Sequence, residues 1–289
     1  MARVVAAVMF VAGVALGTLR DTIPMRETVR VDGFMVLAGD FHVHAFIGDG
    51  GIAPWMLQRQ ATRVGLDVIA ITNHNQTLAG RIGRWASRRV DGPIVITGEE
   101  VTGRDFHLIA VGIERPVGWN QPAARAIDDV HAQGGVAIAA HPTYAFAEGY
   151  DDTALARLDG VEAAHPGRQD PRSEAQFEEF YLHTLALNPG IAAIGSSDVH
   201  VSGALGLCRT YLLVRERSEA GVIEAIREGR TVGRDVKGVL HGAPALVRIV
   251  EAHRAALAPP QPDGLSRLAP VCVWVALFAL AILGPRRSG

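Results

Sequence analysis

The feature that most limits how this chain can fold is a regular alternation of short apolar runs with helix-like segments. The apolar runs have the length of buried strands and cover residues 35–39, 67–72, 93–97, 106–113, 136–139, 160–163, 191–194 and 210–214. Helix-like segments lie between most of them, at residues 54–64, 78–89, 122–133, 173–187 and 218–228. Strands that alternate with helices form a largely parallel sheet. Because about seven such units follow one another, we expect an α/β barrel rather than an open sheet.

The composition excludes several classes of protein. The 289 residues are 48% hydrophobic and 20% charged, with a net charge of −2, which argues against a disordered chain and against a nucleic-acid-binding protein. Cys208 and Cys272 are the only cysteines, so we expect neither a thiolate metal cluster nor a disulfide framework.

The two ends of the chain are apolar and differ from the middle. Residues 1–22 have a short basic start and an apolar core, the pattern of a signal peptide or of an uncleaved membrane anchor. We expect a Pro-rich linker over residues 258–267 and a transmembrane helix over residues 268–284, although a buried C-terminal helix would have the same composition. The main domain is then expected over residues 31–257.

Arginines beside these apolar runs bear on the orientation in a membrane. Arg286 and Arg287 favour a cytoplasmic C-terminus, whereas Arg20, Arg26 and Arg30 argue for the opposite side. Large domains can be translocated despite such charges. We therefore expect a location at the cell membrane, with the main domain on the exoplasmic or periplasmic side.

Histidines and acidic residues follow the predicted strands at their carboxyl ends. His42 and His44 stand two residues apart on an extended segment, so their imidazoles point to the same side and can bind one cation. All strands of a parallel barrel end on one face, and we expect the other strand-end residues to converge there. His107 begins an apolar run and could join them from a neighbouring antiparallel strand. The candidate set is His42, His44, Asp49, His74, Glu100, His107, His141, Asp198 and His200.

This candidate set has the chemistry of a metal centre. Crowded imidazoles and carboxylates would repel one another when charged and lose hydration when neutral, unless cations lie between them. Histidine and carboxylate ligands without thiolates suit manganese, zinc or iron. The nine candidates suffice for two or three divalent ions, with a carboxylate such as Glu100 as a bridge. Glu99 is left out because adjacent residues of a strand point to opposite sides. The alternative is a set of unrelated core and surface histidines.

These residues resemble the pattern of the PHP (polymerase and histidinol phosphatase) superfamily. The resemblance covers residues 40–200 and lies in Asp40-Phe41-His42-Val43-His44 with Asp49, Thr72-Asn73-His74-Asn75, Gly98-Glu99-Glu100, His107-Leu108, Ala140-His141-Pro142 and Ser197-Asp198-Val199-His200. It implies a distorted (β/α)7 barrel of the PHP type with a two- or three-metal centre. The first metal would be held by His42, His44, Glu100 and Asp198, the second by Glu100, His107 and His141, and the third by Asp49, His74 and His200.

Within the superfamily, Gly98-Glu99-Glu100-Val101-Thr102 and Asn75 resemble the carbaryl-hydrolase-like metallohydrolases. Two residues depart from the family pattern, because Asn73 stands where Asp is usual and Gly48 stands where Ser is usual. If the usual Asp orients His74, Asn73 would be a weaker acceptor, and the third site would bind its metal less tightly.

The first functional hypothesis is a metal-dependent phosphoesterase that acts on a small-molecule phosphoester. A metal-activated water is the expected nucleophile, and Asp49 or His200 would protonate the leaving group. Arg168 and Arg209 are candidate phosphate clamps by residue type, and His165 is a candidate substrate contact because it follows a strand.

Other functional hypotheses use the same residues. The centre could hydrolyse a carbamate or carboxylic ester, as the carbaryl-hydrolase resemblance implies, or the chain could be a non-catalytic, membrane-anchored metal-binding module. An amidohydrolase barrel also starts with two histidines in this spacing but usually needs a lysine before its last Asp, whereas Lys237 follows Asp198. The sequence leaves the oligomeric state open.

Overall fold

The computed structural model describes residues 1–19, 25–88, 91–168, 170–201, 205–259 and 264–282. The chain divides into two compact units, of which the first is Met25–Pro259 and the second combines Met1–Pro24 with Pro260–Gly289. We call them the barrel unit and the terminal unit and describe each by itself. Residues 260–263 of the predicted linker lie outside the described residues.

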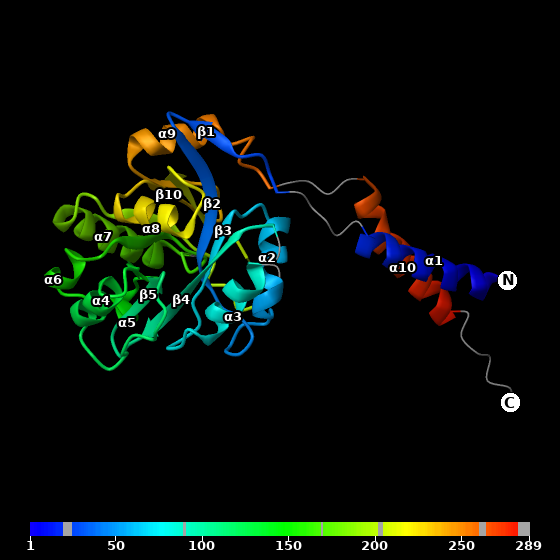
Figure 1. Cartoon of the computed structure of the whole chain (residues 1–289), viewed down its shortest axis with the longest axis horizontal. Helices are drawn as coiled ribbons and strands as arrows, with labels where there is room; N and C mark the ends of the chain where they lie inside the picture. Colours follow the sequence, from blue (N-terminus) through cyan, green and yellow to red (C-terminus); the bar gives the residue numbers. More distant parts are fainter. Residues whose placement is uncertain (20–24, 89–90, 169, 202–204, 260–263, 283–289) are drawn as a thin grey trace. The chain divides into compact units, whose positions relative to one another are not determined.

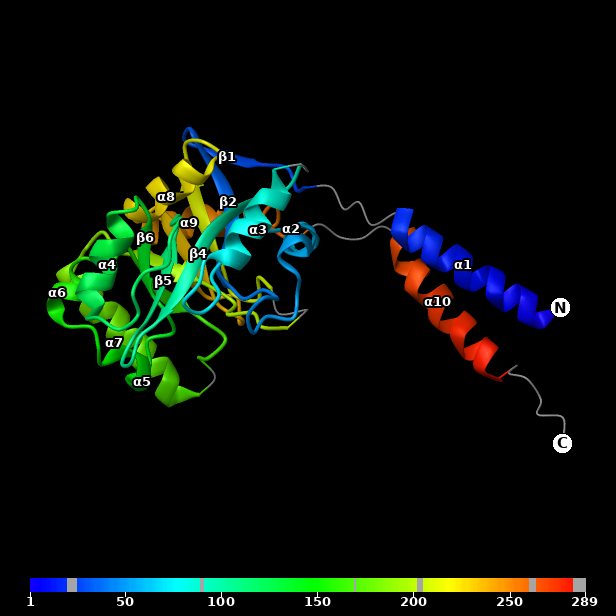
Figure 2. The same cartoon turned by 60° about the horizontal axis from the view of Figure 1, so that its bottom comes forward.

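The barrel unit consists of strands with helices packed around them (Figures 1 and 2). Its strands are β1 (Val29–Val31), β2 (Phe34–Val43), β3 (Val68–Ile71), β4 (Ile94–Thr102), β5 (His107–Val111), β6 (Val136–Ala139), β7 (Gly160–Ala164), β8 (Ala192–Gly195), β9 (Arg209–Val214), β10 (Thr231–Arg234) and β11 (Leu240–Gly242). Its helices are α2 (Pro54–Arg63), α3 (Leu78–Ser87), α4 (Ala123–His131), α5 (Tyr144–Ala147), α6 (Asp152–Leu155), α7 (Pro171–Leu187), α8 (Glu219–Arg227) and α9 (Pro244–Ala252).

The sheet of the barrel unit mixes parallel and antiparallel strands. Within the described ranges the strand order is β11-β10-β9-β2-β3-β4-β5-β6-β7-β8, and β1 pairs with β2. The pairs β2–β3, β3–β4, β6–β7 and β7–β8 are parallel, whereas β5 is antiparallel to both β4 and β6, and β9 is antiparallel to β2. The predicted alternation of strands and helices is confirmed as an α/β barrel-like fold. The expected largely parallel sheet is found only in part, because β5 and β9 run antiparallel to their neighbours.

Strands β8 and β9 meet through a side chain and a glycine. The hydroxyl of Thr210 accepts the Gly195 N–H and lies 2.9 Å from both the nitrogen and the carbonyl oxygen of Gly195. A Cβ on Gly195 would lie 2.3 Å from the carbonyl oxygen of Arg209, so the close approach of the two strands requires glycine. We call this contact between β8 and β9 the seam. The loop after β8 lies close to the end of β2, where Val199 pairs with Val43.

The core of the barrel unit is built from alternate residues of these strands. Leu37, Phe41 and Ile96 belong to one buried cluster, to which α8 contributes Val222 and Ile226. The opposite faces of the strands pack against the surrounding helices. Because apolar side chains fill the interior, polar groups are left to gather at the carboxyl ends of the parallel strands.

The terminal unit contains α1 (Ala2–Leu19) and α10 (Gly264–Ile282), which are helical where apolar segments were predicted. The two helices pack through small residues, since Ala6 and Ala276 are buried and a Cβ on Gly13 would lie 2.9 Å from Val273 Cγ2. Among the described residues, no helix combines the length and the apolar character needed to cross a membrane. The membrane segments predicted over residues 1–22 and 268–284 are therefore not supported within the described residues; residues 20–22 and 283–284 of these predictions lie outside them.

Candidate metal centre

The histidine pair at the end of β2 depends on an irregularity in that strand. The pairing of β2 with β3 shifts in register between Asp40 and Val43. Phe41 therefore belongs to the interior cluster and Val43 to an outer one, which leaves His42 and His44 on the interior side. Their Nε2 atoms lie 3.1 Å apart, and both side chains are fully buried. The predicted shared orientation of this pair is confirmed.

A first group of potential ligands surrounds this pair. Glu100 Oε2 lies 3.2 Å from His42 Nε2 and 3.3 Å from His44 Nε2. Asp198 Oδ1 lies 3.1 Å from His42 Nε2 and 3.2 Å from His44 Nε2. These four atoms converge closely enough to bind one ion.

A second group lies on the other oxygen of Glu100. Its Oε1 is 2.7 Å from His107 Nδ1 and 3.1 Å from His141 Nε2. His107 is the first residue of β5 and reaches the site from an antiparallel strand, as expected. Oε1 of Glu100 thus faces the second group, whereas its Oε2 faces the first group and also lies 2.9 Å from His74 Nδ1. This carboxylate could therefore supply ligand atoms to more than one cation.

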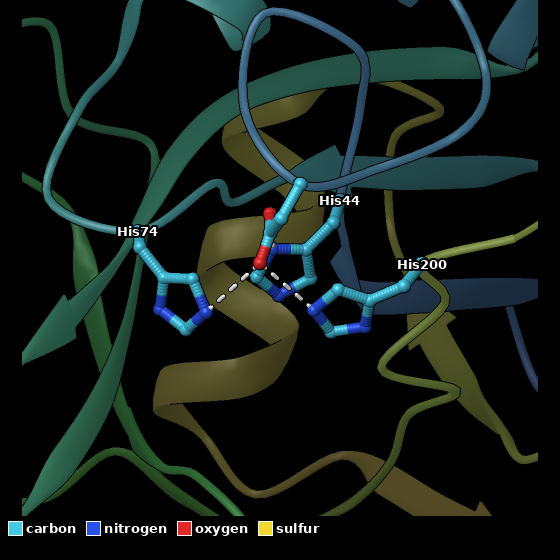
Figure 3. Close-up of side chains that lie close together, drawn as sticks. His44, His74 and His200 are labelled. Atoms are coloured by element: carbon cyan, nitrogen blue, oxygen red, sulfur yellow. Dashed lines mark hydrogen bonds and ion pairs between the residues drawn. The ribbon is translucent and has the colours of Figure 1, made fainter.

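A third group is more exposed and centres on Asp49. Figure 3 shows His74 and His200 on either side of a carboxylate, with His44 behind it. That carboxylate belongs to Asp49, whose Oδ2 lies 3.2 Å from His74 Nε2 and 3.1 Å from His200 Nε2. His44 Nδ1 is 3.0 Å from Asp49 Oδ1, and because its Nε2 faces the first group, its Nδ1–H donates to Asp49.

The charges in these groups shift one another's pKa. Burial lowers the pKa of the His44 imidazole, but hydrogen bonds to Asp198 and Glu100 outweigh it and raise this pKa to about 9. Burial raises the pKa of Glu100, but the charge of His42 and the hydrogen bonds from His107 and His141 hold it well below its usual range. The charges of Asp198 and Glu100 also raise the pKa of His42 against the effect of burial. Without cations His42 and His44 keep protons that a metal must displace, so metal binding at this centre depends on pH.

Buried carboxylates outside the three groups hold the frame of the site. Asp40 accepts hydrogen bonds from the Ser197 backbone N–H at 3.0 Å, the Ser197 hydroxyl at 2.5 Å and the Gly206 N–H at 2.9 Å. It thereby ties the end of β2 to the loop that carries Asp198. Glu162, on β7, lies 3.0 Å from His42 Nδ1, and although burial raises its pKa, the charges of His42 and His165 lower it to about 2.

Two of the potential ligands have an uncommon backbone conformation. His141 has a φ of 25° and Asp198 a φ of 48°, and both lie in the turns that follow β6 and β8. A residue other than glycine in this left-handed region is strained by roughly 1–3 kcal/mol, and such strain is common at functional sites. The turn aims both side chains back towards Glu100.

A pocket of about 340 Å³ opens over the three groups. Members of each group line it, together with Phe146, Phe177 and His165. The Phe146 ring lies 4.2 Å from the His107 ring and 5.1 Å from the His141 ring, measured between centroids. The pocket therefore combines potential ligands at its base with aromatic walls and has room for a small molecule.

The predicted substrate contacts are placed differently from one another. His165 lines the pocket, with Nε2 3.5 Å from Asp198 Oδ2. Arg168 donates to the Ala163 carbonyl and stacks 5.7 Å above the Phe177 ring, beside the pocket lining. Arg209 donates to the carbonyl oxygens of Gly206 and Val64, which directs its guanidinium away from the pocket. The prediction of Arg209 as a phosphate clamp is therefore not supported.

Three residues around the site were not singled out from the sequence. Glu162 could have been noticed as a charged residue inside an otherwise apolar strand. Thr102 ends the motif Gly98-Glu99-Glu100-Val101-Thr102, from which no role was predicted for it; its hydroxyl lies 2.6 Å from His74 Nδ1 and orients that imidazole. No sequence pattern pointed to Phe146, since the short helix α5 places it at the pocket.

The fold and these groups define the class of molecule: an α/β barrel whose strand ends carry converging histidines and carboxylates of the metal-ligating type. The profile of a family described as PHP-associated matches residues 184–231, which include Asp198 and His200. A solved structure with a similar fold is a two-domain protein from Bacteroides vulgatus that contains a predicted PHP-like metal-dependent phosphoesterase. The TM-score is 0.65 at 22% identity, over 78% of this chain and 72% of that one. The chain therefore shares the fold of that protein.

Other similar proteins are more distant or uncharacterized. An uncharacterized protein of Methanocaldococcus jannaschii is 27% identical over 118 residues, which cover 40% of this chain and 68% of that protein. A lesion-specific endonuclease from Pyrococcus furiosus has a TM-score of 0.47 at 15% identity, over 67% of this chain and 56% of that one.

Proposed function

We propose that this protein is a metal-dependent phosphoesterase of the PHP superfamily that hydrolyses a small phosphoester at a centre of two or three divalent ions. The observation that carries the proposal is the gathering of nine histidines and carboxylates, from strand ends far apart in the sequence, into three groups joined by Glu100. The barrel fold shared with the Bacteroides protein supports it.

The donor set fits divalent cations. Asp198 Oδ1 is buried, and His42 Nε2 and His44 Nε2 both face it, at 3.1 and 3.2 Å. Imidazole lone pairs that face a buried carboxylate oxygen need a cation between them. Manganese, zinc and iron accept such ligands. When bound, divalent ions supply an acidified water nucleophile and neutralise charge on a phosphate.

The exposure of each residue indicates whether it would bind metal, transfer a proton or contact the substrate. His42, His44 and Glu100 are buried, so they would act only as ligands. The side chains of Asp49 and His200 are 43% and 38% exposed, so both could meet a leaving group and solvent. Burial raises the pKa of Asp49, but the charge of His44 outweighs it and lowers this pKa, so His200 is the better proton donor of the two. His165 would donate a hydrogen bond to the substrate from the pocket wall. Arg168 could reach a phosphate only after leaving the Ala163 carbonyl.

The proposal is tested with the full-length protein, stripped of metal by a chelator and reloaded with Mn²⁺, Zn²⁺ or Fe²⁺. We expect the reloaded protein to hydrolyse p-nitrophenyl phosphate, and the His42→Ala/His44→Ala variant to lose this activity. A metal-loaded wild type without phosphatase activity contradicts the proposal. Binding of metal with no turnover of any ester would favour the non-catalytic module.

A second candidate is the hydrolysis of a carbamate or carboxylic ester by the same centre. It is favoured by the aromatic wall of the pocket, because Phe146 and Phe177 offer an apolar surface to an aryl group. The same preparation assayed with a naphthyl carbamate separates the two candidates. Turnover of the carbamate without turnover of the phosphate would assign the protein to the carbaryl-hydrolase-like branch.

The cellular location is proposed from the sequence alone. The apolar ends of the sequence support the cell membrane, and Arg286 and Arg287 support a barrel unit on the exoplasmic or periplasmic side, although Arg20, Arg26 and Arg30 favour the other side. Cell fractionation followed by protease treatment of intact cells tests this location. Recovery of the whole chain in the soluble cytoplasmic fraction contradicts it.

A further inference from the structure

Glu162 is a buried carboxylate that belongs to none of the three ligand groups described above. It lies in the middle of β7, and its side chain is 0% exposed. Its neighbour Val161 packs in an outer cluster, so Glu162 points into the barrel below the pocket. A carboxylate in such a place needs partners for both of its oxygens.

The partners of Glu162 come from two other strands. Its Oε1 lies 3.0 Å from His42 Nδ1, and its Oε2 accepts the backbone N–H of His141 at 2.5 Å. One carboxylate therefore connects the ends of β2 and β6, each of which carries a ligand of a different group. His165 Nε2 lies further away, at 4.0 Å from Oε2.

His42, Glu162 and His165 are close enough together to suggest a fourth cation site, but their hydrogen bonds exclude it. The Gly167 N–H donates to His165 Nδ1 at 2.9 Å, so the proton of the neutral ring sits on Nε2. A protonated Nε2 has no lone pair for a cation. A neutral His42 has one ring lone pair, and on Nε2 it points to the first group, because this nitrogen faces Glu100 and Asp198.

We propose that Glu162 is a positioning residue that holds His42 in the tautomer needed for metal binding, with Nδ1–H donated to Glu162 and the Nε2 lone pair aimed at the first group. The proposal rests on the proposed metal centre. Carboxylates that accept a hydrogen bond from a ligating histidine fix its orientation and raise its basicity. Glu162 does this from outside the pocket, without touching the substrate.

The His141 N–H allows a specific test of the proposal, because a backbone N–H can donate a hydrogen bond but cannot accept one. In a Glu162→Gln variant, a carbamoyl oxygen that accepts the His141 N–H leaves the NH₂ group facing His42. His42 must then accept at Nδ1 and carry its proton on Nε2, where it blocks the metal. In the opposite orientation, the NH₂ group of the glutamine collides with the His141 N–H. The variant keeps the shape of glutamate and loses its function as a double acceptor.

The test measures Zn²⁺ affinity of the full-length protein by competition with a chromophoric chelator. We expect Glu162→Gln to weaken the tightest Zn²⁺ site by about 10- to 100-fold, while Glu162→Asp, which keeps the carboxylate, is weakened less. Glu99→Gln is the matched control, because Glu99 is equally buried, accepts the Val117 N–H and no other hydrogen bond from the described residues, and faces away from the site. Its Zn²⁺ affinity should equal that of the wild type.

Each result decides between the two proposals. Wild-type protein that binds no Zn²⁺ overturns the metal centre and this inference with it. Wild-type binding together with unchanged affinity in Glu162→Gln overturns the role of Glu162 alone. If Glu162→Gln does not fold, long-range ¹H–¹⁵N spectra of the Zn²⁺-loaded wild type give the tautomer of His42 directly. A proton on Nδ1 supports the inference, and a proton on Nε2 overturns it.

Discussion

The side-chain amide of Asn73 fills the space in which a side chain on Gly48 would begin, since a Cβ built on Gly48 would lie 2.0 Å from Asn73 Nδ2. The amide also accepts the Ala45 N–H at 3.1 Å and donates to the Ala45 carbonyl at 2.7 Å. An aspartate could not make the second of these bonds. The two departures from the PHP pattern, Asn73 and Gly48, are therefore coupled. Asn73 braces the backbone beside His44, and Thr102 rather than Asn73 orients His74.

This coupling predicts a strongly non-additive pair of substitutions. Gly48→Ala should lower the free energy of unfolding by about 1–3 kcal/mol, because the added methyl group collides with the amide. In an Asn73→Ala background the collision is gone, so the same change should have a much smaller effect. Urea unfolding of the two single variants and the double variant measures the coupling, which we expect to be about 0.5–3 kcal/mol. Additive effects of the two changes would show that the residues do not share this space.

The raised pKa of His44 predicts how the metal-free protein responds to pH. This pKa rises from 6.5 to about 9 in the folded state, so the protonated imidazole stabilises the fold. The contribution is fully present below pH 6.5 and is lost as the pH rises through 9. Thermal unfolding in the presence of a chelator should show a falling Tm over this range. With Zn²⁺ bound, the decline should be much smaller, and a metal-free Tm that rises towards pH 9 would contradict the assignment.

Glu99 predicts a stabilising substitution outside the metal centre. Burial raises the pKa of this carboxyl from 4.5 to about 7, and only the Val117 N–H opposes the shift. A raised carboxyl pKa means that stability is fully present below pH 4.5 and is lost as the pH rises through 7. Glu99→Gln cannot ionise, so at pH 8 it should raise the free energy of unfolding by about 1–3 kcal/mol. At pH 4.5 the gain should disappear, and an equal gain at both pH values would argue against ionisation as its cause.

Phe146 predicts a defect in substrate binding that spares the metals. Its ring covers His107 and His141 at the pocket wall, and Phe146→Ala removes this surface. The loss of about 1–2 kcal/mol of apolar contact should raise KM for p-nitrophenyl phosphate by roughly 5- to 30-fold, with little change in kcat. Metal content should stay at the wild-type level. Phe278→Ala is the control, since Phe278 is 70% exposed in the terminal unit. A similar rise in KM for this variant would show that the loss of the pocket wall is not the cause.

Much of the candidate site could be predicted because each ligand carries a local signal. His42 and His44 share a strand spacing that fixes their common side, and Glu100 alternates with Glu99 on β4 for the same reason. His141 and Asp198 each end an apolar run. Since the ends of parallel strands meet on one face of a barrel, these local signals were sufficient to predict a shared centre.

What could not be predicted depends on contacts between distant residues. An apolar strand looks the same in either direction, so nothing in the run 210–214 indicates that β9 is antiparallel to β2. Arg209 has the residue type of a phosphate clamp, but its partners Val64 and Gly206 are brought to it only by the fold. The pairing of Glu162 with His42 spans 120 residues and is equally invisible in the sequence.

Asp40 does not line the pocket, yet it joins β2 to Ser197 and Gly206, which lie between β8 and β9 in the sequence. A separation of β8 from β9 at the seam would therefore move Asp198 away from His42 and His44. An ion bound by all three residues would oppose this separation. Metal binding at the centre would then also stabilise the closed barrel.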